Sequence, residues 1–170
     1  MSLQPFGFTS DDDLSYEETD EIMLSQRGRY ALKAMLNLAR SGTSRQPKQV
    51  SLIAVEENIP RKFLETIMSE LREEKLVESV RGKFGGYRLQ RPAEMITFGQ
   101  IMRVTDGPIA LVPCVSHNFY KRCDDCVDET SCALRRVMAE VRREASEILD
   151  RTSLADAAAR PALIDQVAGH

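Results

Sequence analysis

The sequence has no apolar run that approaches the roughly 18 residues needed to cross a bilayer. Its first residues also lack the basic stretch followed by an apolar stretch that marks an export signal. We therefore expect a cytoplasmic protein that has no membrane partner.

The sequence also lacks the motifs of common enzyme classes. It contains no nucleophile elbow and no paired catalytic carboxylates. The glycine-rich residues 82–86 lack the Gly-Lys-Ser/Thr ending and the following helix of a phosphate-binding loop. We therefore predict that the protein is not an enzyme, with no catalytic residues.

Basic residues are missing from residues 1–22, which carry seven acidic side chains. Residues 23–92, in contrast, carry 14 Lys and Arg against 7 Asp and Glu, and residues 93–170 carry 9 against 12. The net charge of −3 therefore hides a basic module between two acidic segments, which suits a phosphate-binding unit. We expect residues 1–22 to form an acidic, disordered extension.

The basic module has the pattern of a winged helix-turn-helix. Helical spacing of apolar residues follows Ser25, a second helix starts at Ser51, and a third follows Pro60 over about residues 61–75. Strand-like residues 76–80 and 87–89 bracket a glycine-rich basic turn, which predicts a β-hairpin. The predicted fold is mainly α, with a winged helix-turn-helix domain over residues 23–92 and a small β-hairpin wing.

The remaining chain divides into three parts. Residues 93–133 are expected to hold a fourth helix, capped by Thr97, and a cysteine-containing sensor loop. Residues 134–152 form an amphipathic stripe that predicts a long C-terminal dimerisation helix, although packing against its own domain would also satisfy the stripe. Residues 153–170 are assigned to a C-terminal tail.

The predicted partner is double-stranded DNA, because the N-terminal part of the second helix of a helix-turn-helix reads the major groove. Arginine and lysine pair with guanine acceptors, glutamate accepts from cytosine, and an arginine in the wing suits a narrow minor groove. Amides and side chains at the start of the first helix suit phosphate contacts. Ordinary solvated charges are the alternative for each residue taken alone. The candidate DNA-binding residues are Ser25, Arg27, Arg29, Tyr30, Arg61, Lys62, Glu65, Thr66, Arg81, Lys83 and Arg88.

All four cysteines lie close together at positions Cys114, Cys123, Cys126 and Cys132, separated by eight, two and five residues. Cytoplasmic proteins rarely use cysteines for disulfides, so this cluster indicates metal, iron–sulfur or redox chemistry. A zinc ribbon prefers two Cys-x-x-Cys knuckles and this loop has one, which favours an iron–sulfur cluster held by these four residues. A redox-active Cys123–Cys126 dithiol is an alternative, but acidic Asp124 and Asp125 oppose thiolate formation.

The segments LSQRGRYAL (residues 24–32), FLE (63–65), LVESVRG (76–82) and GGY (85–87) resemble the IscR/NsrR-type regulators of the Rrf-two family. The similarity covers about residues 23–155. It implies a dimeric winged-helix transcription factor, and many such factors carry a 2Fe–2S or 4Fe–4S cluster, whereas others respond to cysteine metabolism without one. The resemblance also assigns base reading to Glu65 and wing contact to Arg81.

By the same resemblance, the three cluster ligands are Cys114, Cys126 and Cys132. The position of the family's histidine is occupied here by Arg135, which cannot ligate, so Cys123 or a carboxylate of the partner subunit is the fourth candidate. The sequence thus predicts a homodimeric DNA-binding regulator controlled by a cluster that senses iron–sulfur status, iron, nitric oxide or redox stress. In this hypothesis, assembly or loss of the cluster reorders residues 107–132.

Two other functions stay open at this level. One is a cluster-free regulator controlled by thiol oxidation or by a partner from cysteine metabolism. The other is a thiol oxidoreductase that uses Cys123 and Cys126.

Overall fold

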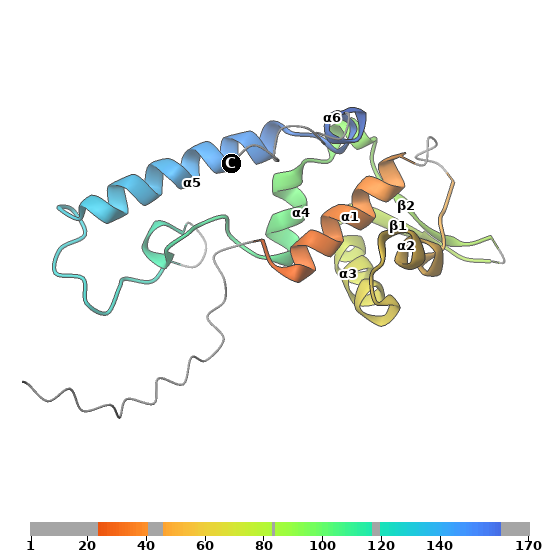
Figure 1. Cartoon of the computed structure of the whole chain (residues 1–170), viewed down its shortest axis with the longest axis horizontal. Coiled ribbons are helices and arrows are strands. Elements are labelled where there is room, and N and C mark those ends of the chain that lie inside the picture. Colours follow the sequence, from red (N-terminus) through yellow and green to blue (C-terminus); the bar gives the residue numbers. More distant parts are fainter. Residues whose placement is uncertain (1–23, 41–45, 83, 117–119, 161–170) are drawn as a thin grey trace, which may run out of the picture.

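The computed structural model of the chain describes residues 24–40, 46–82, 84–116 and 120–160 (Figure 1). Three helices open the described chain: α1 (Gln26–Arg40), α2 (Val50–Glu57) and α3 (Arg61–Glu73). The Ser25 hydroxyl accepts a hydrogen bond from the Gly28 amide at 2.9 Å and so caps α1, as its residue type predicts. Helix α2 begins at Val50, one residue before the predicted start at Ser51, and it has no side-chain cap.

Strands β1 (Val77–Val80) and β2 (Gly86–Leu89) form the predicted hairpin. They are antiparallel, with Val77 opposite Leu89 and Val80 opposite Gly86. Lys48, just before α2, exchanges two 2.8 Å backbone hydrogen bonds with Tyr87 and so extends the sheet across β2. The wing is therefore fixed to the segment that leads into α2.

The core lies where α1, α2 and α3 meet the hairpin. The apolar face predicted for α3 is the observed one, since Leu64, Ile67, Met68 and Leu71 are all buried. Met35 of α1 and Ile53 of α2 are buried against this face. Burial of one side of a helix leaves its opposite side free for contacts with a partner.

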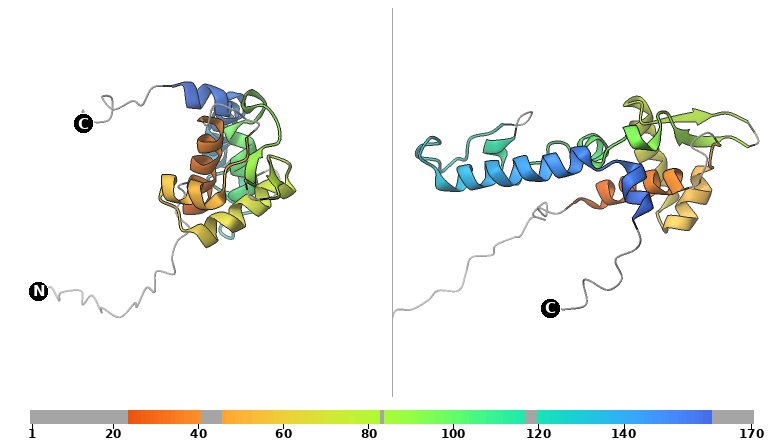
Figure 2. Two further views of the ribbon diagram at one scale, coloured as in Figure 1. Left: turned by 90° about the vertical axis from the view of Figure 1, so that its right-hand side faces the viewer. Right: turned by 90° about the horizontal axis from the view of Figure 1, so that it is seen from above.

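Beyond the hairpin, the chain runs through η1 (Ala93–Met95), α4 (Phe98–Thr105), η2 (Pro113–Val115), α5 (Ala133–Arg151) and α6 (Leu154–Ala159). Thr97 and Gln100 form a capping box at the start of α4, as the cap assignment from the sequence predicts. Figure 1 and Figure 2 show α5 projecting from the winged domain as a long arm. This confirms the predicted fold class, a winged helix-turn-helix followed by a long C-terminal helix.

Helix α5 has no buried residue along its whole length. Leu134, Val137, Val141 and Ile148 are exposed apolar side chains on it. A double hydrogen bond of Arg103 in α4 to Asp150 in α5, at 2.7 Å for each of two nitrogens, fixes the C-terminal end of the arm. Within the described residues, no helix is long and apolar enough to span a membrane.

The end of the described chain differs from the sequence-based division, which assigned residues 153–170 to a tail. Ser153 and Asp156 form a capping box for α6, and Leu154 is fully buried in the core. The Leu154 amide donates to the Ile96 carbonyl at 2.8 Å, which pairs the segment with the chain before α4. Residues 153–159 therefore complete the winged domain, while the predicted extension 1–22 and residues 161–170 lie outside the described residues.

We predict that Leu154→Ala lowers the free energy of unfolding by about 2–5 kcal/mol, because it removes a fully buried side chain and leaves a cavity. Urea denaturation followed by circular dichroism measures the loss. Val55→Ala on α2 is the control, since Val55 is 79% exposed and alanine favours a helix. An equal effect of both substitutions would contradict the role assigned to α6.

Candidate DNA-binding surface and cysteine loop

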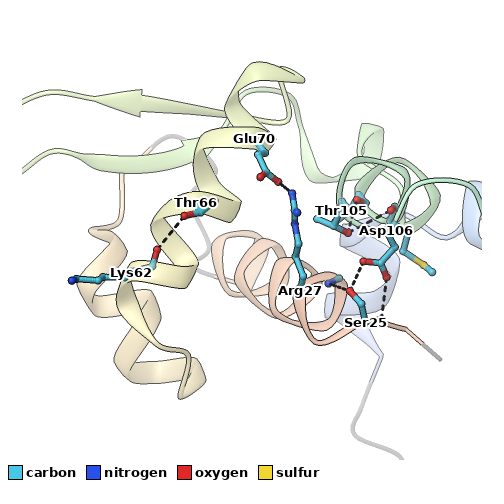
Figure 3. A network of polar contacts seen from close by, with 10 residues as sticks. Ser25, Arg27, Lys62, Thr66, Glu70, Thr105 and Asp106 are labelled. Carbon is cyan, nitrogen blue, oxygen red and sulfur yellow. Dashed lines mark hydrogen bonds and ion pairs between the residues drawn. The ribbon is translucent and has the colours of Figure 1, made fainter. Parts of the chain in front are cut away.

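The N-terminal half of α3 presents the candidate base-reading residues to solvent. Arg61, Lys62 and Thr66 are exposed, and the Thr66 hydroxyl lies 3.4 Å from the Lys62 carbonyl oxygen (Figure 3). The Arg61 Nε donates to the Glu65 carboxylate at 2.8 Å. An exposed pair one helical turn apart is worth only a few tenths of a kcal/mol, so a nucleic acid could displace it at roughly that cost.

On the wing, Arg81 is exposed and forms no ion pair with any described residue. Arg88 lies opposite Glu78 across the hairpin and donates from Nε to its carboxylate at 2.7 Å. Arg88 is thus held along the sheet, whereas Arg81 extends from the end of β1. The remaining wing candidate, Lys83, lies outside the described residues.

The start of α1 contains residues predicted to touch phosphate, and the structure divides them into two groups. Arg29 is exposed and lies 6.0 Å from the ring centre of Tyr30, which packs edge-on against Phe63 of α3. Arg27 instead forms an ion pair with Glu70 of α3 (Figure 3). Ser25 and Arg27 therefore form hydrogen bonds or ion pairs with distant parts of the protein, whereas Arg29 stays exposed.

Asp106 is the partner of Ser25, and sequence reasoning did not identify it. Its carboxylate accepts from the Ser25 hydroxyl at 2.5 Å and from the Ser25 amide at 3.2 Å (Figure 3). Asp106 is the C-terminal cap of α4, and the chain leaves α4 into the cysteine loop at Gly107. The carboxylate lies at the positive end of α1, where the helix dipole favours a negative charge. Ser25 and Asp106 are 81 residues apart in the sequence, so no local sequence pattern predicts their contact.

The absence of a side chain at Gly28 permits this contact. A Cβ atom at residue 28 would lie 2.3 Å from Asp106 Oδ2, which is closer than any real contact. Gly28 therefore serves to let the carboxylate reach the first turn of α1.

The cysteine loop connects α4 to α5 and supplies all four thiols. Cys114 is buried in η2, Cys123 is exposed, and Cys126 and Cys132 are half-buried. Cys132 caps α5, its sulfur accepting from the Arg135 amide at 3.4 Å. Arg135 also donates from Nε to the Cys114 carbonyl at 3.3 Å, which joins the start of α5 to η2.

The Cys123 thiol lies beside Cys114. A hydrogen bond with the Cys114 thiol, together with partial desolvation and the nearby Asp125 carboxylate, raises the pKa of Cys123. A raised pKa reduces the thiolate fraction and hence the nucleophilicity near neutral pH. Asp125 thus opposes formation of the Cys123 thiolate, as expected from the sequence. This effect weakens the alternative in which the protein is a thiol oxidoreductase.

The four thiols suit an iron–sulfur cluster by their number and chemistry. Their placement in this conformation does not, because no three potential ligands come together into a metal site within the described ranges. The thiols of Cys114 and Cys123 interact with each other. A cluster held by these cysteines would require a different conformation of residues 107–132.

Comparison with known proteins identifies the class. Residues 24–160 match the family model Rrf2, described as an iron-dependent transcriptional regulator. An Rrf2-like HTH-type transcriptional regulator of Rhodobacter capsulatus is 40% identical over 144 residues, covering 82% of this chain and 96% of that protein. The chain is thus a winged helix-turn-helix transcriptional regulator, and it belongs to the Rrf2 family, as the resemblance in its sequence indicated.

Solved structures include relatives of two kinds. CymR of B. subtilis, titled its global cysteine regulator, has a TM-score of 0.66 and 35% identity, covering 80% of this chain and 95% of that one. IscR of T. potens has a TM-score of 0.62 and 29% identity, covering 79% and 85%. Family membership therefore establishes transcriptional regulation and leaves the signal undetermined.

We predict that Gly28→Ala destabilises the protein by about 1–3 kcal/mol, because the added methyl group expels the Asp106 carboxylate from the first turn of α1. In an Asp106→Ala background the same change should be neutral, or stabilising by up to about 1 kcal/mol, because alanine is the better helix former. Urea denaturation of the four proteins measures this coupling. Equal effects in both backgrounds would contradict it.

Proposed function

We propose that this chain is a homodimeric regulator that binds double-stranded DNA through α3 and the wing, under the control of an iron–sulfur cluster on the cysteine loop. The observation that carries the DNA-binding part is the exposed N-terminal half of α3. Arg61, Lys62 and Thr66 all lie on it, opposite the face buried in the core. An α-helix presented in this way fits the major groove, with its N-terminal residues at base edges.

The arm formed by α5 supports the homodimer. A 19-residue helix without a buried residue exposes an apolar stripe that includes Val137 and Val141. Such a stripe is unfavourable in water, and a second copy of the same helix would bury it. Two copies would place two α3 helices on one DNA molecule, as a two-fold operator requires.

A continuous set of contacts supports control from the cysteine loop. The loop begins next to Asp106, whose carboxylate holds Ser25 at the start of α1. Two residues further on, Arg27 is paired with Glu70 of α3. A change in loop conformation that moves Asp106 would therefore displace α1 relative to the DNA-reading helix.

Cys114, Cys126 and Cys132 are the proposed cluster ligands, with Cys123 as the candidate fourth. When bound, the cluster would supply a centre whose stability depends on iron supply, oxidants and nitric oxide. Cys132 caps α5 and Cys114 lies in η2. Each of the two segments that Arg135 joins therefore supplies one of the proposed ligands. A cluster-free regulator is the second candidate. It is favoured by the Arg135 contact that holds η2 to α5 while the cysteines are free thiols, and by the similarity to CymR.

For DNA binding, we predict that Arg61→Ala weakens affinity about tenfold or more, because one charged contact to a base or phosphate is lost. Fluorescence anisotropy, with a duplex that the wild-type protein enriches from a randomised pool, measures the dissociation constant. Arg72→Ala at the other end of α3 is the matched control and should bind as wild type does. Similar losses in both variants would contradict the assigned reading end of α3.

For the dimer, we predict a mass of twice 19.1 kDa in sedimentation velocity, shifted toward the monomer by Val141→Asp. The substitution places a charge in the apolar stripe of α5. Arg143→Asp introduces the same carboxylate at another exposed position of α5 and should leave the dimer intact. A wild-type monomer at micromolar concentration would refute the proposed assembly.

For the cluster, we expect anaerobically purified protein to absorb visible light and to contain iron and acid-labile sulfide in the ratio of a 2Fe–2S or 4Fe–4S centre. Cys114→Ser, Cys126→Ser and Cys132→Ser should each abolish the absorption, and Cys123→Ser tests the fourth ligand. A colourless protein that resists reconstitution, yet binds DNA in a form with all four cysteines changed to serine, would instead establish the cluster-free candidate.

A further inference from the structure

A cavity of about 600 Å³ opens between α1, the C-terminal half of α3, α4 and the chain that follows β2. Leu76 and Val104 contribute apolar surface, and arginines and glutamates supply the charge. Its volume is typical of sites for small ligands. The cavity contains none of the cysteines and none of the exposed residues at the N-terminal end of α3.

Two arginines, Arg27 and Arg91, line the cavity. Arg27 is paired with Glu70, whereas Arg91 forms no ion pair with any described residue. The Arg91 guanidinium group is therefore available to an anionic group in the cavity, since guanidinium N–H groups bind carboxylates with high directionality.

Acidic side chains occupy another part of the same cavity. Glu73 and Glu74, at the end of α3, line it and form no ion pair with any described residue. Glu70, by contrast, is paired with Arg27, and Arg103 of the lining is paired with Asp150. The unpaired charges of the cavity are therefore the guanidinium group of Arg91 and the carboxylates of Glu73 and Glu74.

A simple anion would meet repulsion from the two free carboxylates, and a simple cation would leave the guanidinium donors unsatisfied. A molecule with both charges satisfies both sets. We propose that the cavity binds a small zwitterion of the α-amino acid class, with its carboxylate at Arg91 and its ammonium group at Glu73 and Glu74. The Leu76 and Val104 surface would receive its side chain.

The test is calorimetric titration of the DNA-free dimer or monomer with each common L-α-amino acid at millimolar concentration. Each compound is compared with its N-acetyl derivative, which lacks the ammonium group, and with its amide, which lacks the carboxylate. We expect at least one free amino acid to bind and both of its derivatives to bind at least about tenfold more weakly. Because no DNA is present, the result is independent of the DNA-binding proposal.

Variants locate the site. Arg91→Met, and separately the double change Glu73→Gln with Glu74→Gln, should each weaken binding about tenfold, whereas Arg72→Met outside the cavity should not. Glu73 and Glu74 are exposed, so their double variant retains the fold even where Arg91→Met does not. The proposal is overturned if no amino acid binds, if an N-acetyl derivative binds as tightly as its parent, or if the double variant binds like wild type.

Discussion

The Asp106 carboxylate at the first turn of α1 is the contact on which the remaining arrangement depends. It ends α4, accepts two hydrogen bonds from Ser25, and lies over the space left by Gly28. Because the carboxylate is at the positive end of α1, both charge and geometry hold it there. The next residue along the chain begins the cysteine loop, so the loop starts from a point fixed to the DNA-binding domain.

Helix α1 is therefore more than a scaffold for the core. Its first turn receives Asp106, and its next residues hold α3 through the Arg27–Glu70 pair and through the edge-on packing of Tyr30 against Phe63. Exposed ion pairs contribute little by themselves, but these contacts act together over one short helix segment. A few side chains therefore connect the start of the cysteine loop to α3, and each of them can be substituted separately.

The sequence predicted the elements that have local signals. Apolar spacing defined the inner face of α3, Thr97 marked the start of α4, and the glycine-rich basic turn marked the wing. It did not predict contacts between distant residues, such as Ser25 with Asp106 or Arg27 with Glu70, because no periodicity records them. Leu154 was missed although Ser153 and Asp156 have capping-box spacing, since the alanine-rich stretch that follows has little apolar pattern.

Helix α4 is the junction of the molecule. Ile101 is buried in the core, Asp106 holds α1, and Arg103 holds Asp150 near the end of α5. The approach of α5 is close, since a Cβ atom at Gly99 would lie 2.0 Å from Asp150 Oδ1. The proposed dimer helix and the DNA-reading domain are thus both tied to the last turn of one eight-residue helix. A rotation of α4 would move both together, so the cysteine loop, which leaves the end of this helix, is well placed to couple dimer geometry to the spacing of two α3 helices.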